Sequence, residues 1–118
     1  MKKFMAVYTG TPGSFEKWQQ KFADPEARKA QEKKGMEAWT KWVETHRKDI
    51  VEGGGPLGKT KAVSAAGIQD TRNNLAAYVV VQAESQEAAA KLFLDHPHFR
   101  IFPGDSVEIM EILPVPTR

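Results

Sequence analysis

Two segments of this chain are apolar on both faces of a strand, and they constrain its fold more than any other feature. Residues 4–8 (FMAVY) and 75–83 (LAAYVVVQA) are continuous apolar runs rather than alternating ones. Such runs are typical of strands buried on both sides of a sheet, and the β-branched centre of the second run favours a strand over a helix. The sequence therefore predicts two central strands.

Helical patterns separate these two segments. Asp24 and Pro25 supply an N-cap and a first-turn proline, so we expect a helix to begin at Pro25, after a short helix around residues 15–22. Apolar residues at helical spacing beyond Gly35 then indicate an amphipathic helix that packs on a core; they are Met36, Trp39, Val43, His46 and Ile50. Ser85 caps a later helix, which we expect Pro97 to end.

The rest of the chain supplies two more strands. We expect a turn or a bulged strand start over 52–58, a weak strand over 59–65, a polar loop over 67–74 and a last strand over 107–113. The resulting order is β-α-β-β-α-β, the pattern of ferredoxin-like α+β folds with a four-stranded antiparallel sheet. The sequence thus predicts a single domain over residues 1–118.

This arrangement predicts an oligomer as well as a fold. Two helices cover only one face of the sheet, yet both central strands are apolar on two faces. The second face therefore needs a partner, and the simplest partner is another copy of the same sheet. We expect a homodimer formed by sheet-to-sheet packing.

Composition excludes several classes of protein. The chain has no cysteine, which rules out disulfide scaffolds and zinc-cysteine sites. Its net charge of +2 comes from mixed-sign segments without a basic stripe, so no nucleic-acid partner is expected. No apolar window approaches the ~18 residues of a membrane span, and the first eight residues fit a strand better than a signal peptide. We therefore expect no membrane partner and a cytoplasmic location.

Several ordered segments resemble the YCII-related family. They are KKFMAVY, MEAWTKW, GGGPLG, AYVVVQAES leading into EAAAKLF, DHPHF and VEIMEILPVP, and together they span nearly the whole chain. The resemblance implies a dimeric α+β barrel. It also implies action on small cyclic organic compounds, through a histidine and an acidic residue in a cleft between sheet and helices.

The chain departs from the family pattern at three places. The family histidine on the first long helix is missing, because Ala38 and Trp39 stand in its position. His96-Pro97 stands where members near the founding protein have Asp-Pro, and the loop after Gly67 lacks the Asp-Gly-Pro-Phe motif of another branch. The resemblance therefore supports the fold more strongly than it supports an activity.

Asp95, His96 and His98 form the only cluster of two histidines and a carboxylate near one another in the chain. A histidine can take up or release a proton near neutral pH, and a neighbouring carboxylate can orient it. His96 continues the apolar helix face and is the stronger cleft candidate, whereas His98 fits a solvated position equally well. The structural alternative is a helix end, where histidines interact with the helix dipole and proline stops the helix.

Five residues are candidates for the wall and mouth of the cleft. Trp39 and Trp42 lie about one turn apart and could line a pocket for a planar ligand, although aromatic residues on a helix face are more often core. Glu52, Gly54 and Pro56 belong to the glycine-rich segment at the expected cleft mouth, and Glu52 is a second candidate orienter. His46 with the two later histidines makes a poor ligand set, so neither a metal site nor a cofactor is expected.

These features predict a cofactor-free lyase or isomerase that acts on a small cyclic or carbonyl compound. His96 would be the acid/base, with Asp95 or Glu52 as its orienter and the two tryptophans as the apolar wall. Two alternatives remain: a binding module that holds a metabolite without reaction, and a scaffold whose whole function is dimerisation. In the scaffold, Trp39 and Phe93 would fill the cleft.

Overall fold

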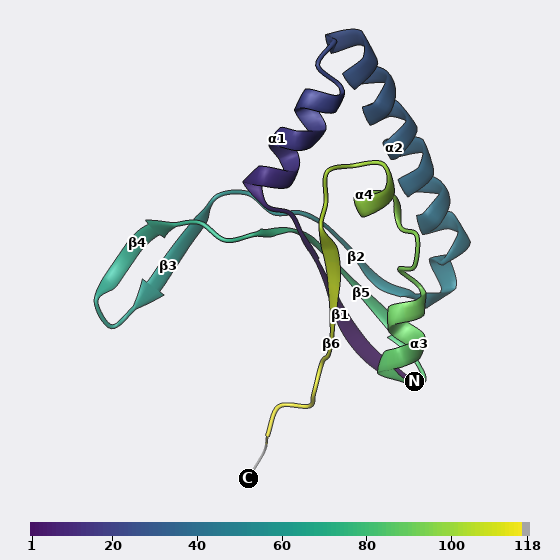
Figure 1. Ribbon diagram of the computed structural model, residues 1–118. Helices are drawn as coiled ribbons and strands as arrows, with labels where there is room; N and C mark the ends of the chain where they lie inside the picture. Colours follow the sequence, from purple (N-terminus) through teal and green to yellow (C-terminus); the bar gives the residue numbers. More distant parts are fainter. Residues whose placement is uncertain (117–118) are drawn as a thin grey trace.

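The two apolar segments lie at the centre of a four-stranded antiparallel sheet, as the sequence predicted. A computed structural model describes residues 1–116 and gives the strand order β2-β5-β1-β6 (Figure 1). The central strands are β1 (Lys2–Thr9) and β5 (Leu75–Ala83), and the edge strands are β2 (Ile50–Pro56) and β6 (Ser106–Glu111). All three strand pairs are antiparallel.

One face of this sheet forms the core with the helices. Alternate residues of β1 point to that face, and Phe4 and Ala6 pair with Val81 and Val79 of β5. These four side chains are at most 4% exposed. They pack against aromatic and aliphatic side chains of the helical layer. In both strands, therefore, every second side chain faces the core.

The helix expected to begin at Pro25 is longer than the apolar stripe suggested. Helix α1 (Pro12–Lys21) precedes α2 (Pro25–Thr45), which runs without interruption through Gly35. Met36, a member of the predicted stripe, is 59% exposed, and Ile50 begins β2 after the short 3₁₀ turn η1 (Arg47–Asp49). The stripe was wrong at its start, where Met36 faces solvent, whereas Ile50 packs against the core as predicted but from β2 instead of the helix.

The later helical region was also predicted with the wrong end. Helix α3 spans only Gln86–Lys91, and Pro97 begins the short helix α4 (Pro97–Arg100) instead of ending α3. His96 is the N-cap of α4, and its side chain accepts a hydrogen bond from the backbone of His98. A proline is favourable at the first helical position because the missing N–H is unpaired there in any helix.

The weak strand predicted over 59–65 is confirmed, but the polar loop predicted over 67–74 contains a second strand, and the two form a β-hairpin. Strands β3 (Thr60–Ser64) and β4 (Gly67–Thr71) pair only with each other and project away from the main sheet (Figure 1). The strand that follows β1 along the chain in the main sheet is β2, and its register against β5 is irregular. Gly54 of β2 has φ +63, and a side chain there would collide with the carbonyl of Tyr78.

The opposite face of the main sheet carries the remaining alternate side chains. Met5 pairs with Val80 on one side and Met110 on the other, outside the core cluster. Met110 is 46% exposed. The helices of Figure 1 therefore leave an apolar sheet face without a cover of their own. Separately, none of the helices within residues 1–116 has the length and apolarity needed to cross a membrane.

Candidate functional site

The space between the sheet and α2, where the sequence predicted a cleft, is filled by rings. The His96 ring centre lies 4.5 Å from that of Trp39 and 4.6 Å from that of Trp42. Tyr8 and Phe93 complete the contacts around it, at 5.1 and 5.9 Å. Trp42 also donates its Nε1 hydrogen to the Leu92 carbonyl at 2.9 Å. The two tryptophans therefore pack in the core. The space predicted to be a cleft is filled by Trp39 and Phe93, as the scaffold alternative expected, so an enzyme needs a site elsewhere.

His96 uses both ring nitrogens inside this cluster and is fully buried. Its Nδ1 accepts from the backbone N–H of His98 at 3.0 Å, so the neutral ring carries its proton on Nε2. Nε2 lies 3.3 Å from the Tyr8 hydroxyl oxygen, to which it donates. Burial, together with the charges of His98 and His46, lowers the pKa of His96 to about 3. This arrangement makes His96 a neutral structural residue.

Neither carboxylate predicted to orient His96 is hydrogen-bonded to its ring in the described structure. Asp95 is exposed at φ 60, and its carboxylate accepts from Arg100 at 3.0 Å. Glu52 accepts from the Tyr78 hydroxyl at 2.9 Å, and this hydrogen bond is the main reason that the pKa of Tyr78 is raised. The two carboxylates thus engage other partners, away from the buried ring.

His98 occupies a different environment, although only one residue separates it from His96. Its Nε2 donates to the Thr9 carbonyl at 2.7 Å, and the residue is 7% exposed. Within residues 1–116 its Nδ1 has no hydrogen-bond partner, whereas no buried side-chain nitrogen or oxygen there is left unpaired. Nδ1 therefore reaches solvent. The prediction that His98 fits a solvated position was wrong for the ring as a whole, but one nitrogen remains accessible.

Two neighbours influence His98, one by packing and one by charge. Gly104 lies against its Nε2 edge, where a Cβ atom would overlap the ring. Asp105 accepts from the backbone N–H of Thr11 at 2.6 Å and from the Ser14 hydroxyl, and both bonds lower the pKa of Asp105. Its negative charge raises the pKa of His98, as does the bond to Thr9, but burial has the larger effect and lowers it. The resting ring is thus neutral at pH 7.

His98 lines a broad cleft at the base of the hairpin, with a volume of about 1260 Å³. The cleft is formed by residues 10–12, 58–61, 70–76 and 102–104, with Phe15 and His98. Its walls are the end of β1, the start of α1, the root of the β3–β4 hairpin and the loop before β6. Its size exceeds the ~300–1,000 Å³ of typical ligand pockets, as expected of an open cleft.

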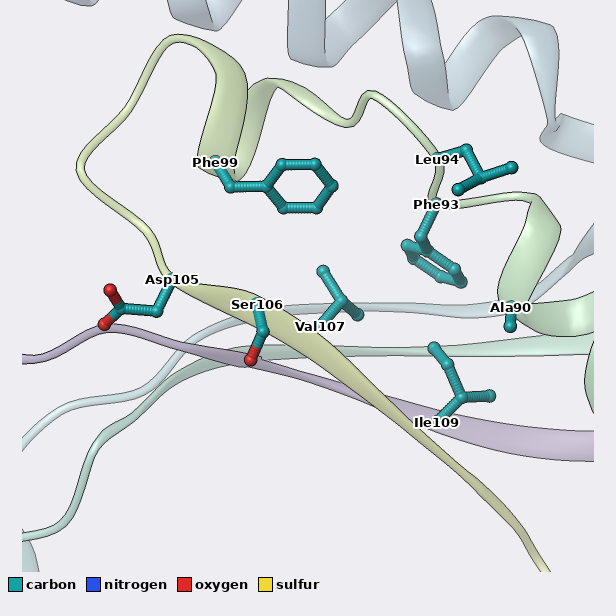
Figure 2. A pocket seen from close by; sticks show the side chains of 8 residues that line it. All are labelled: Ala90, Phe93, Leu94, Phe99, Asp105, Ser106, Val107 and Ile109. Atoms are coloured by element: carbon teal, nitrogen blue, oxygen red, sulfur yellow. The ribbon is translucent and has the colours of Figure 1, made fainter.

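A second cavity of about 290 Å³ lies between β6, α3 and α4 (Figure 2). Phe93, Phe99, Val107 and Ile109 point into it, whereas the carboxylate of Asp105 is turned away. Neither histidine lines this cavity. Its lining is mostly apolar and its one titratable residue, Asp105, has its carboxylate turned away, so the cleft at His98 is the stronger candidate site.

The candidate binding residues lie outside the cleft at His98. Trp39, Trp42, Glu52, Gly54 and Pro56 are absent from its described lining. Residues that do line it on the hairpin were not singled out, because the polar 59–74 segment has no pattern that ties it to His98. No three His, Asp or Glu side chains within residues 1–116 converge as metal ligands.

Comparison with known proteins supports the fold. No family model and no curated protein matches the chain. A solved structure does match: 5-chloro-2-hydroxyhydroquinone dehydrochlorinase from Burkholderia phenoliruptrix AC1100, in complex with 2,5-dihydroxybenzoquinone. The TM-score is 0.51 at 15% identity, over 92% of this chain and 90% of the dehydrochlorinase. This chain therefore shares the α+β fold of that enzyme.

Proposed function

We propose that this protein is an enzyme that moves protons on a small cyclic organic molecule, with His98 as its general base. The observation that carries the proposal is the split role of the His98 ring, which lines the cleft: Nε2 is anchored on the Thr9 carbonyl, and Nδ1 has no hydrogen-bond partner among the described residues. A neutral imidazole with one fixed donor and one accessible lone pair is suited to accept a proton.

The chemistry proceeds by proton transfer without a covalent intermediate. Nδ1 of His98 takes a proton from a carbon next to a carbonyl, and the C–H electron pair moves to form an enolate. The imidazolium is stabilised by the Thr9 carbonyl and by the charge of Asp105. An isomerase then returns the proton to a different atom of the substrate, whereas a lyase expels a leaving group with its electron pair.

Two further observations support a small cyclic substrate and a histidine as the base. The structural neighbour is named as a dehydrochlorinase of a hydroxylated ring and is bound to a quinone, which favours a small cyclic substrate on this fold. The resemblance to the YCII-related dimeric α+β barrels points to the same substrate class. In that family the acid/base is a histidine, and we assign this role to His98 in place of His96.

Hydrogen exchange tests the proposal without a known substrate. The protein is incubated in D₂O with cyclohexanone or with 2-cyclohexenone, each of which carries sp3 C–H protons next to its carbonyl, and loss of these signals is followed by NMR. Wild type is expected to accelerate exchange of at least one probe, by roughly 10²-fold or more. His98→Gln, whose Nε2 can still donate to Thr9, should lose this acceleration. Binding of a probe with no exchange would overturn the enzyme and favour the binding-module alternative.

We also propose the homodimer that the sequence predicted, with the two sheets packed face to face in a ferredoxin-like α+β barrel. The support is the uncovered apolar face that contains Met5, Val80 and Met110. Sedimentation should give a dimer for wild type and a monomer for Met110→Glu, because the new carboxylate would be buried without a partner. A wild-type monomer at micromolar concentration would contradict this assembly.

A further inference from the structure

The cleft beside His98 has a cationic side on the hairpin. Lys59 and Arg72 both line it. They flank the last pair of the β3–β4 ribbon, Thr60 with Thr71, so the antiparallel register brings them to the same end of the hairpin on opposite strands. Like charges at opposed positions of a ribbon repel each other, and a bound anion would relieve the repulsion.

The other charges of the hairpin are already paired. The Lys61 ammonium lies 2.6 Å from the Asp70 carboxylate, and Asp70 is the only acid among the described cleft-lining residues. Neither Lys59 nor Arg72 forms an ion pair with any residue of the described chain. The cleft thus combines a histidine whose Nδ1 is not hydrogen-bonded with two cations that have no counterion among residues 1–116.

We infer that the substrate carries a planar acidic group, such as a carboxylate, that binds to Lys59 and Arg72 while its reacting carbon lies at His98. A guanidinium group presents parallel donors that match two oxygens sharing one negative charge, and a lysine adds a point charge. The cleft that all three residues line has a volume of about 1260 Å³, more than a six-membered ring occupies. This inference rests on the proposed function of His98 and adds the substrate class.

A matched pair of probes separates the anion site from the catalytic base. Exchange of the α-protons is compared for cyclohexanone and for 4-oxocyclohexanecarboxylate, which carry the same ketone and differ in the acid group. Wild type should show about tenfold higher kcat/KM for the acid, through a lower KM. The double variant Lys59→Gln/Arg72→Gln should lose this preference, so that its kcat/KM becomes similar for the two ketones.

A second double variant controls for net charge. Lys29→Gln/Arg47→Gln removes the same charge from exposed positions outside the cleft, and it should keep the preference for the acid. The inference is overturned if wild type treats both ketones alike, or if the cleft double variant keeps the preference. Calorimetric titration with 4-oxocyclohexanecarboxylate covers the case in which neither ketone exchanges. Binding lost with Lys59 and Arg72 would then support the anion site alone, and no binding would overturn it.

Discussion

The packed interior around His96 and the open cleft at His98 put the same side chain to opposite uses. His96 is surrounded by rings and has both nitrogens engaged, so its proton is locked in place. His98 has one nitrogen anchored and one accessible. The difference teaches that two histidines of similar burial can offer different chemistry. Only His98 has a ring nitrogen without a hydrogen-bond partner among the described residues, which is why we propose it as the base.

The largest expected effect comes from the base itself. His98→Gln keeps a donor for the Thr9 carbonyl but removes the basic nitrogen, so the exchange rate should fall by about 10²-fold or more with unchanged stability. Because burial lowers the pKa of His98, wild-type activity should persist below pH 6.5 and fall only as the pH drops through that lowered pKa. NMR exchange rates from pH 5 to 8 test both statements. Equal activity of the variant would remove the distinction between the two histidines.

The second prediction is that acid lowers the free energy of unfolding, mainly because His96 is buried in its neutral form. The folded protein keeps this ring neutral above about pH 3, whereas the unfolded chain takes up a proton below about pH 6.5. The stability present above pH 6.5 is therefore lost as the pH falls, by about 2 kcal/mol between pH 7 and 5. Urea unfolding at pH 7 and 5 should show that His96→Asn, whose side chain can still cap α4, loses about 2 kcal/mol less unfolding free energy than wild type. The same acid loss in both proteins would contradict a buried neutral His96.

The smallest effect concerns the tryptophans of the interior. Trp42→Phe leaves the Leu92 carbonyl without its donor and should cost about 1 kcal/mol of unfolding free energy, with proton exchange unchanged. Trp18→Phe is a matched control, since Trp18 also donates to a carbonyl, that of Ile101 at 3.0 Å, from a less buried position. We expect a smaller cost there. A large loss of activity in Trp42→Phe would indicate that Trp42 contacts the substrate, as the sequence analysis proposed.

The two central strands could be predicted because each is marked by an apolar run within one short segment of the sequence. The runs that form β1 and β5 are apolar whatever their partners, so their position in the sheet followed from composition. The prediction that Pro97 ends the helix was wrong because proline occurs both after helix ends and at helix starts. Here Asp95 turns the chain with φ 60, and Pro97 begins α4. The hairpin was missed at its second strand, since residues 67–71 are exposed and show no alternation that burial would impose.

The site could be predicted only in part, for a related reason. Sequence drew attention to Asp95, His96 and His98 as a cluster, but the choice among them depends on distant residues. Tyr8 and Thr9, almost ninety positions earlier, decide which nitrogen is satisfied. The cleft likewise combines the start of α1 with the hairpin, and no spacing in the chain indicates that they meet.

The most direct test of the different roles of the two histidines is an NMR titration of their ring nitrogens. With ¹⁵N-labelled protein, His96 should keep the signals of a neutral ring protonated on Nε2 from pH 7.5 down to 4.5. His98 should show the same tautomer at pH 7.5, with an Nδ1 signal that shifts when 2,5-dihydroxybenzoquinone is added. Protonation of His96 near pH 6.5, or an Nδ1 of His98 that does not respond to the probe, would contradict the account.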